Sequence, residues 1–308
     1  MIELQRKLIG DTVRNEAFAR AIQTAVQPDS NVIDLGAGTG FLGFLAARAG
    51  AKSVTCIESG DIIDTAKKLA KRNGITGINF MHQHSTAIKK LPPADILISE
   101  TLGNYALEEN IIESVEDAKR FLKPGATIIP GKVTQMVCPV VTDRLQKEID
   151  VWAPGFDLQF DEARTITLNN IYVKTVKKDD LLAESGAIRP FDHIDFSLKN
   201  QSVRSALESW KVDRPVTVSG FALWWEAELL PGITLSTSPM EKPTHWEQIY
   251  LPLLTPVTLE SGESIEWKLT SDTRWSVKIN LVWTVTHRDA EGNVRSSQTL
   301  DMRKGFIN

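Results

Sequence analysis

The sequence predicts an α/β protein in which a parallel sheet covered by helices is followed by an antiparallel β-barrel. Helical and strand-like periods alternate from Asp11 to about Gly125, which is typical of a parallel sheet flanked by helices. Beyond Pro130, short segments of alternating apolar and polar residues take over, as in antiparallel barrels and sandwiches. The length of 308 residues suits two domains, since a domain usually contains roughly 100–200 residues. We therefore expect domains at 1–130 and 131–308.

The elements of the first domain follow in order from the hydrophobic period. A helix is expected over 11–26, ahead of a buried strand at 31–35. Further strands are expected at 53–58, 78–80 and 94–99, and further helices at 41–49, 61–73 and 109–121. The last helix should end at a Lys123-Pro124-Gly125 turn, because proline and glycine both interrupt helices.

The second domain is expected to be rich in strands. Alternating segments occur at 133–141, 216–229, 264–270 and 276–287. Residues from about 148 to 188 carry mixed helix and loop signals and are interpreted as an inserted arm.

Composition excludes several classes of function. A net charge of −4 and a pI near 5.8 argue against general binding to nucleic acid, which requires basic surfaces. Cys56 and Cys138 lie in apolar segments without a metal-ligand pattern, so no metal site is expected and both are interpreted as buried free thiols. Neither a signal peptide nor a membrane span is recognisable. We therefore expect a cytoplasmic protein that binds no membrane.

The segment VIDLGAGTGFLG places three glycines between a strand and an apolar helix. Gly36, Gly38 and Gly40 allow the backbone to turn sharply and to approach a ligand at the carboxyl edge of a Rossmann-like sheet. Glu58, at the end of the next strand, is positioned to accept hydrogen bonds from ribose hydroxyls.

The spacing of the glycines favours one class of nucleoside ligand. A dinucleotide fingerprint, G-x-G-x-x-G, would require glycine where the chain has Phe41. The strand-end Asp34 and the small-residue turn suit a cationic ligand without a pyrophosphate. These features predict S-adenosylmethionine as the cofactor.

Two glutamates follow the fourth strand of the first domain. Glu100 stands at the carboxyl end of that strand, and Gly103-Asn104 permits a hairpin that returns Glu109 towards it. Two carboxylates brought together in this way could hold one cation.

These segments together resemble the protein arginine methyltransferases. DTVRNEAFARAI (11–22) is similar to the helix that precedes the family's first motif, and VIDLGAGTG to that motif itself. SETLGNYALEE and the following KPGATIIP resemble the loop that carries the family's glutamate pair. In the second half, STSP (236–239) and Thr244-His245-Trp246 resemble the threonine-histidine-tryptophan loop. The matches span residues 11–285 in the family's order.

The resemblance implies a reaction, an assembly and a set of residue roles. The reaction is methyl transfer from S-adenosylmethionine to a guanidino nitrogen of arginine in a protein or peptide, and the assembly is a homodimer that uses the arm. By resemblance, Arg14 would bind the cofactor carboxylate, Glu58 its ribose, Glu100 and Glu109 the substrate guanidinium, and His245 would pair with Asp11, while Trp246 could line the substrate channel.

The chain departs from the family's pattern at three places. Only ten residues precede Asp11, so the tyrosine- and phenylalanine-bearing lid segment is expected to be missing or replaced. Thr101-Leu102 stands where the family usually has Trp-Met, which changes the wall beside the guanidinium. The acidic residue that binds adenine is not evident in HQHSTAI (82–88), where Ser85 or Thr86 could supply a weaker contact.

Three other interpretations stay open on the sequence. One is a methyltransferase for a small amine or guanidino compound that uses the same carboxylates. Another is a cofactor-binding interaction protein without catalysis, which would require none of Glu100, Glu109 and His245. A nucleotide-dependent oxidoreductase is disfavoured by Phe41.

Overall fold

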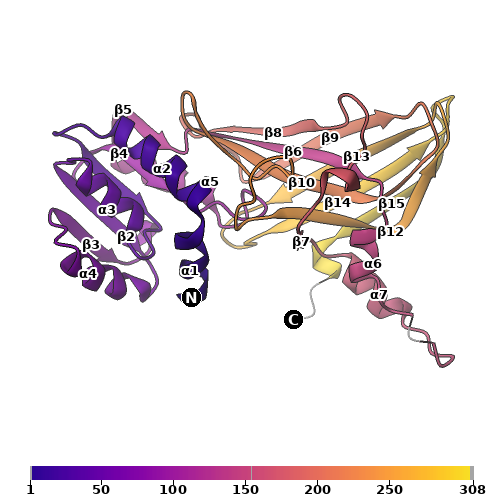
Figure 1. Cartoon of the computed structure of the whole chain (residues 1–308), viewed down its shortest axis with the longest axis horizontal. Coiled ribbons are helices and arrows are strands. Elements are labelled where there is room, and N and C mark those ends of the chain that lie inside the picture. The colour runs from indigo at the N-terminus through magenta and orange to yellow at the C-terminus, as the bar shows by residue number, and fades with distance from the viewer. Residues whose placement is uncertain (1, 154, 306–308) are drawn as a thin grey trace.

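The first half of the chain is a five-stranded parallel sheet. The computed structural model describes residues 2–153 and 155–305, and Figure 1 shows the two halves side by side. The sheet order is β3-β2-β1-β4-β5. Its strands are β1 (Asn31–Leu35), β2 (Ser53–Glu58), β3 (Ile78–His82), β4 (Ala94–Ser99) and β5 (Leu122–Ile129). The helices of this half are α1 (Ile2–Gly10), α2 (Thr12–Ala25), α3 (Phe41–Arg48), α4 (Ile62–Arg72) and α5 (Ile111–Ala118), with short 3-10 turns η1 (Ser85–Ala87) and η2 (Lys119–Phe121).

Buried apolar strands determine this architecture. In β1, Val32 pairs with Val54 of β2 on one side and with Ile96 of β4 on the other. Helix α3 packs against β1 and β2, α4 against β3, and α5 against β4. Strands covered in this way are apolar throughout, so the expected α/β fold is confirmed.

The sheet order reverses next to β1. The chain passes from β1 outwards to β2 and β3, and then returns to β4 on the other side. Loops after β1 and β4 therefore leave the same edge in opposite directions, and ligands of open α/β sheets bind in the crevice between such loops. The glycine turn and the loop of Glu100 both begin there.

The structure corrects two expectations for this half. Lys123-Pro124-Gly125 does not form a turn outside the sheet but lies within β5. The register jumps there, since Ala94 pairs with Leu122 and Ile96 with Thr127, so the segment is a bulge that accommodates proline and a Gly125 φ of 76°. The second correction is α1, a helix that the sequence analysis did not predict.

The second half consists of two antiparallel sheets. One has the order β7-β12-β10-β6-β8 with β11 beside β10, and the other the order β15-β14-β13-β9. The strands are β6 (Lys132–Val140), β7 (Tyr172–Lys174), β8 (Arg189–Asp195), β9 (Val203–Lys211), β10 (Val216–Leu230), β11 (Ile233–Ser236), β12 (Gln248–Leu259), β13 (Ser264–Asp272), β14 (Asn280–Arg288) and β15 (Val294–Asp301), followed by η4 (Met302–Lys304). The expected strands are present, although the last begins at Asn280 rather than at residue 276. Six of the eight tryptophans are buried in this half and belong to its core.

The expected arm leaves the sheets as a helical projection. It begins with α6 (Arg144–Ile149) and α7 (Asp161–Leu168), which Figure 1 shows extending away from the sheets. The chain then returns to the sheet through β7, which pairs with β12, and continues into η3 (Lys178–Asp180). The described helices include none that is long and apolar enough to cross a membrane. Cys56 and Cys138 are both buried and unpaired, as expected.

Candidate functional site

The glycine turn approaches its neighbours closely enough to require glycine. Gly36 and Gly38 have φ values of 73° and 53°, in the left-handed region that side chains disfavour. A Cβ atom on Gly36 would lie 2.7 Å from the methyl group of Thr101, and one on Gly38 would lie 2.8 Å from Oε1 of Gln5. The turn is therefore wedged between the loop after β4 and helix α1.

Two carboxylates accept hydrogen bonds from backbone N–H groups in and beside the glycine turn. Asp34 is 2% exposed, and its Oδ2 accepts a hydrogen bond of 2.7 Å from the Gly43 N–H. Burial raises the pKa of Asp34 to about 7. Glu58 accepts from the N–H groups of Gly38 at 2.9 Å and Gly60 at 2.7 Å. Each Glu58 oxygen keeps a lone pair that could accept a hydrogen bond from a ribose hydroxyl. Asp34 can affect a cofactor indirectly, through the position of the glycine turn.

Arg14 and Glu100 form a buried ion pair at the start of the site. Nε of Arg14 donates to Oε2 of Glu100 at 2.8 Å, and Nη2 donates to the same oxygen. Their side chains are 6% and 5% exposed. Nη1 of Arg14 donates to Asn15, so three of its five N–H donors are engaged and two could bind a cofactor carboxylate.

The loop from Glu100 to Glu109 is bound tightly to the second half of the chain. The indole N–H of Trp246 donates to the Leu102 carbonyl at 2.6 Å, and that of Trp225 donates to the Gly103 carbonyl at 2.9 Å. The two indoles contact each other edge to face, 4.8 Å apart. Trp246 is only 2% exposed, so it supports the loop as well as lining the cavity below it.

Glu100 and Glu109 line the same cavity, which has a volume of about 450 Å³. Burial, together with the negative charges of Glu100 and Glu108, raises the pKa of Glu109 to about 7. Glu109 is exposed and lines the cavity, while the protein packed around its carboxyl group reduces the hydration of that group. Glu108 points back into the loop, where its Oε1 accepts the Asn104 N–H at 2.8 Å.

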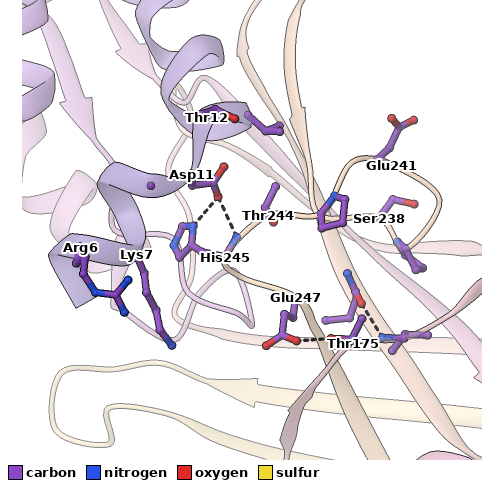
Figure 2. A pocket seen from close by; sticks show the side chains of 16 residues that line it. Arg6, Lys7, Asp11, Thr12, Thr175, Ser238, Glu241, Thr244, His245 and Glu247 are labelled. Atoms are coloured by element: carbon purple, nitrogen blue, oxygen red, sulfur yellow. Dashed lines mark hydrogen bonds and ion pairs between the residues drawn. The ribbon is translucent and has the colours of Figure 1, made fainter. Parts of the chain in front are cut away.

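Asp11 connects the N-terminal helices to the loop that contains His245. Its Oδ1 accepts the Arg14 N–H and caps α2, while its Oδ2 accepts from the His245 backbone N–H at 2.9 Å and lies 2.7 Å from His245 Nδ1. Figure 2 shows both bonds to His245. Burial alone would raise the pKa of Asp11, but hydrogen bonds from His245 and Arg14 lower it below its ordinary value. The expected pairing of Asp11 with His245 is present in the structure.

Ser85 and Thr86 lie apart from these groups. Neither lines the cavity of Glu100 and Glu109. The Ser85 carbonyl accepts from Arg120 at 2.9 Å, and the Thr86 hydroxyl lies 2.8 Å from His84 Nδ1. Their contact with adenine stays a prediction.

Helix α1 supplies site residues that sequence reasoning missed. Leu4, Gln5, Lys7 and Leu8 line the cavity, and the Thr39 N–H donates to Gln5 Oε1 at 3.3 Å. Apolar residues at positions 2, 4, 8 and 9, followed by glycine at position 10, were a weak helical signal. Glu247, which also lines the cavity, carried no signal beyond its position after Trp246.

Comparison with known proteins identifies the family. The profile of the arginine methyltransferase oligomerization subdomain matches residues 132–287, just over half of the chain. The chain belongs to the protein arginine methyltransferase family. It is thus an S-adenosylmethionine-dependent methyltransferase, and residues 17–152 match a second methyltransferase profile, that of the ribosomal protein L11 methyltransferase.

Individual relatives of this arginine methyltransferase agree with the assignment. A probable protein arginine N-methyltransferase 6.1 of Oryza sativa subsp. indica is 26% identical, covering 86% of this chain and 80% of the relative. An arginine N(omega)-methyltransferase of Streptomyces achromogenes is 29% identical, covering 85% and 74%. The solved enzyme–prozyme heterotetramer of a Trypanosoma brucei arginine methyltransferase superposes with a TM-score of 0.85 at 20% identity, covering 97% of this chain and 98% of that one.

Proposed function

We propose that this methyltransferase uses Glu100 and Glu109 to hold the guanidinium of an arginine in a protein or peptide while a terminal nitrogen is methylated. The observation that carries the proposal is the position of both carboxylates in one cavity, beside the glycine turn at Gly36. Guanidinium is planar and positively charged, so two carboxylates can bind it through fork-like hydrogen bonds.

The cofactor turn fits S-adenosylmethionine by its chemistry. Close backbone approach at the glycines, the remaining lone pairs of Glu58 and the two remaining N–H donors of Arg14 suit a nucleoside that carries an amino-acid carboxylate. When bound, this cofactor supplies a methyl group made electrophilic by a sulfonium. The ribose and carboxylate roles of Glu58 and Arg14 are part of the proposal.

The carboxylates would prepare the nitrogen for attack. Hydrogen bonds from the guanidinium to Glu100 and Glu109 draw its positive charge towards them and leave electron density on the nitrogen that faces the methyl group. With the cofactor bound, the new N–C bond would form at the expense of the methyl–sulfur bond, whose electron pair would stay on the sulfur. The methylated nitrogen then releases a proton, and an ionised Glu109, whose pKa is about 7, is suited to accept it.

Transfer of labelled methyl groups tests the proposal directly. Arginine peptides should be labelled and lysine-matched peptides should not. Glu109→Gln should reduce the labelling by about 10²–10³-fold, while Glu108→Gln is the matched control, because Glu108 bonds to the loop backbone rather than facing the acceptor. Equal labelling of both peptides that survives Glu109→Gln would exclude the arginine site.

A small guanidino compound is a second candidate acceptor. One relative is named an arginine N(omega)-methyltransferase without reference to a protein, which supports this alternative. Methylation of free guanidino compounds in the absence of any methylation of arginine peptides would make the alternative the better description.

We also propose that two copies of the chain associate through the arm. The family profile is that of an oligomerization subdomain, and the arm exposes Val151, Phe156 and Leu158 by 71%, 90% and 58%. Apolar groups exposed on a projection favour burial against another chain. Phe156→Asp should convert a dimer to a monomer in analytical ultracentrifugation, and a wild-type monomer would contradict the proposal.

A cytoplasmic location completes the proposal. Two buried cysteines without a disulfide are typical of a reducing compartment. Cell fractionation with compartment markers would test it.

A further inference from the structure

The cavity of the two glutamates opens into a second one. This neighbour has a volume of about 650 Å³, and Lys7, His245 and Glu247 line both cavities. An acceptor that enters through the second cavity and places its guanidinium between Glu100 and Glu109 would pass these three residues. Figure 2 shows Lys7 and Glu247 extending from different segments that line the second cavity, Lys7 from α1 and Glu247 from the loop that contains His245.

Glu247 is held in an unfavourable backbone conformation. Its φ is 51°, a left-handed value that is uncommon for residues with a side chain. Both of its neighbours are fixed, since Trp246 donates to the Leu102 carbonyl and the Gln248 side chain accepts the Val176 N–H. The Glu247 carboxylate accepts a hydrogen bond from the Thr175 hydroxyl. Strain of this kind is concentrated at functional sites, and here it directs a carboxylate to the boundary between the cavities.

Lys7 supplies a cation on the opposite side. No described carboxylate lies within 4.0 Å of its Nζ, whereas its neighbour Arg6 is paired with Glu3. Lys7 and Glu247 are also not paired with each other among the described residues. The shared boundary thus presents one positive and one negative group to whatever lies between them.

We propose that Lys7 and Glu247 bind the α-carboxylate and the α-ammonium group of free arginine, so that the enzyme methylates the amino acid as well as arginine in peptides. The inference rests on the proposed function, because it requires a guanidinium between Glu100 and Glu109. Three methylene groups separate the α-carbon of arginine from its guanidino nitrogen, and the proposal places its two charged α-groups at the boundary. A peptide presents neutral amides there and gains less from two opposite charges.

Four acceptors separate the two contacts. L-arginine carries both α-charges, agmatine lacks the carboxylate, Nα-acetyl-L-arginine lacks the ammonium group, and Nα-acetyl-L-arginine amide lacks both. Lys7→Gln should raise KM about three- to tenfold for arginine and acetylarginine but leave agmatine unchanged. Glu247→Gln should raise KM similarly for arginine and agmatine but leave acetylarginine unchanged. The doubly blocked amide should respond to neither substitution.

Arg6→Gln is the matched control, because Arg6 lines only the second of the two cavities and is paired with Glu3. It should leave all four KM values unchanged. If arginine peptides become labelled and free arginine does not, this inference is wrong and the proposed function stands. Failure to methylate any guanidino acceptor would instead overturn the proposed function. Equal responses of all four acceptors to Lys7→Gln and Glu247→Gln would also contradict the subsite.

Discussion

The two ends of the Glu100–Glu109 loop differ in how their charge is balanced. At the start, Glu100 is buried against the guanidinium of Arg14. At the end, Glu109 has no described cation within ion-pair distance, and its pKa is raised to about 7. The two glutamates are therefore not equivalent. Glu100 is fixed by Arg14, whereas in the proposed function Glu109 would gain its favourable partner when a guanidinium enters.

The largest effect on the protein is expected from substituting Arg14, the cation paired with Glu100. Arg14→Leu leaves Glu100 buried without a partner, which should lower the free energy of unfolding by about 3–5 kcal/mol. Chemical denaturation would measure the loss. The double variant Arg14→Leu/Glu100→Leu should recover most of it without recovering activity. A double variant as unstable as the single one would show that the ion pair is not what matters there.

Substitution of Glu109, at the other end of the loop, should affect catalysis more than stability. Glu109→Gln is expected to lower kcat/KM by about 10²–10³-fold, because one of two charged acceptors is lost. At pH 8 its thermal midpoint should be equal or higher, since the raised pKa of Glu109 means that its ionised form opposes folding. Below about pH 4.5 this advantage should disappear. A marked loss of stability at pH 8 would contradict the account.

The pH dependence should reveal the titration of Glu109. Below its pKa of about 7 the carboxyl group is protonated and neutral, so kcat/KM should fall about tenfold from pH 8 to pH 6. Glu109→Gln should abolish this step. Asp34 also has a pKa near 7, so Asp34→Asn is the matched control and should keep the step. A step that follows Asp34 rather than Glu109 would reassign it.

The smallest effect is expected from the indole bonds at the Glu100 end of the loop. Trp246→Phe removes the hydrogen bond to the Leu102 carbonyl and should cost about 1 kcal/mol in stability. Trp225→Phe, which removes the bond to Gly103, should cost a similar amount. Both variants should raise KM for the acceptor by a few fold, because the loop loses part of its support. An unchanged KM would show that either indole alone positions the loop.

Much of the parallel-sheet half was predictable because its signals are local. Three segments could be predicted from their own residues alone: the β1 sequence NVIDL, the glycines that follow it and the amphipathic α4. The Lys123-Pro124-Gly125 segment was wrongly predicted because its conformation depends on pairing with another strand. Proline and glycine favour a turn locally, but pairing of β5 with β4 on both sides of the segment absorbs them as a bulge. Helix α1 was missed because its short apolar pattern buries no residue fully.

The fold class, the glycine turn proposed to bind the nucleoside and the two candidate glutamates could all be predicted from the sequence, since each depends on residue types at short spacings. Only the tertiary structure decided that Arg14 neutralises Glu100 and not Glu109, that Trp225 and Trp246 hold the loop between them, and that Lys7 and Glu247 meet at one opening. These relations join residues far apart in the chain, from α1 to the loop before β12. Their energies depend on burial and distance, which no local pattern encodes.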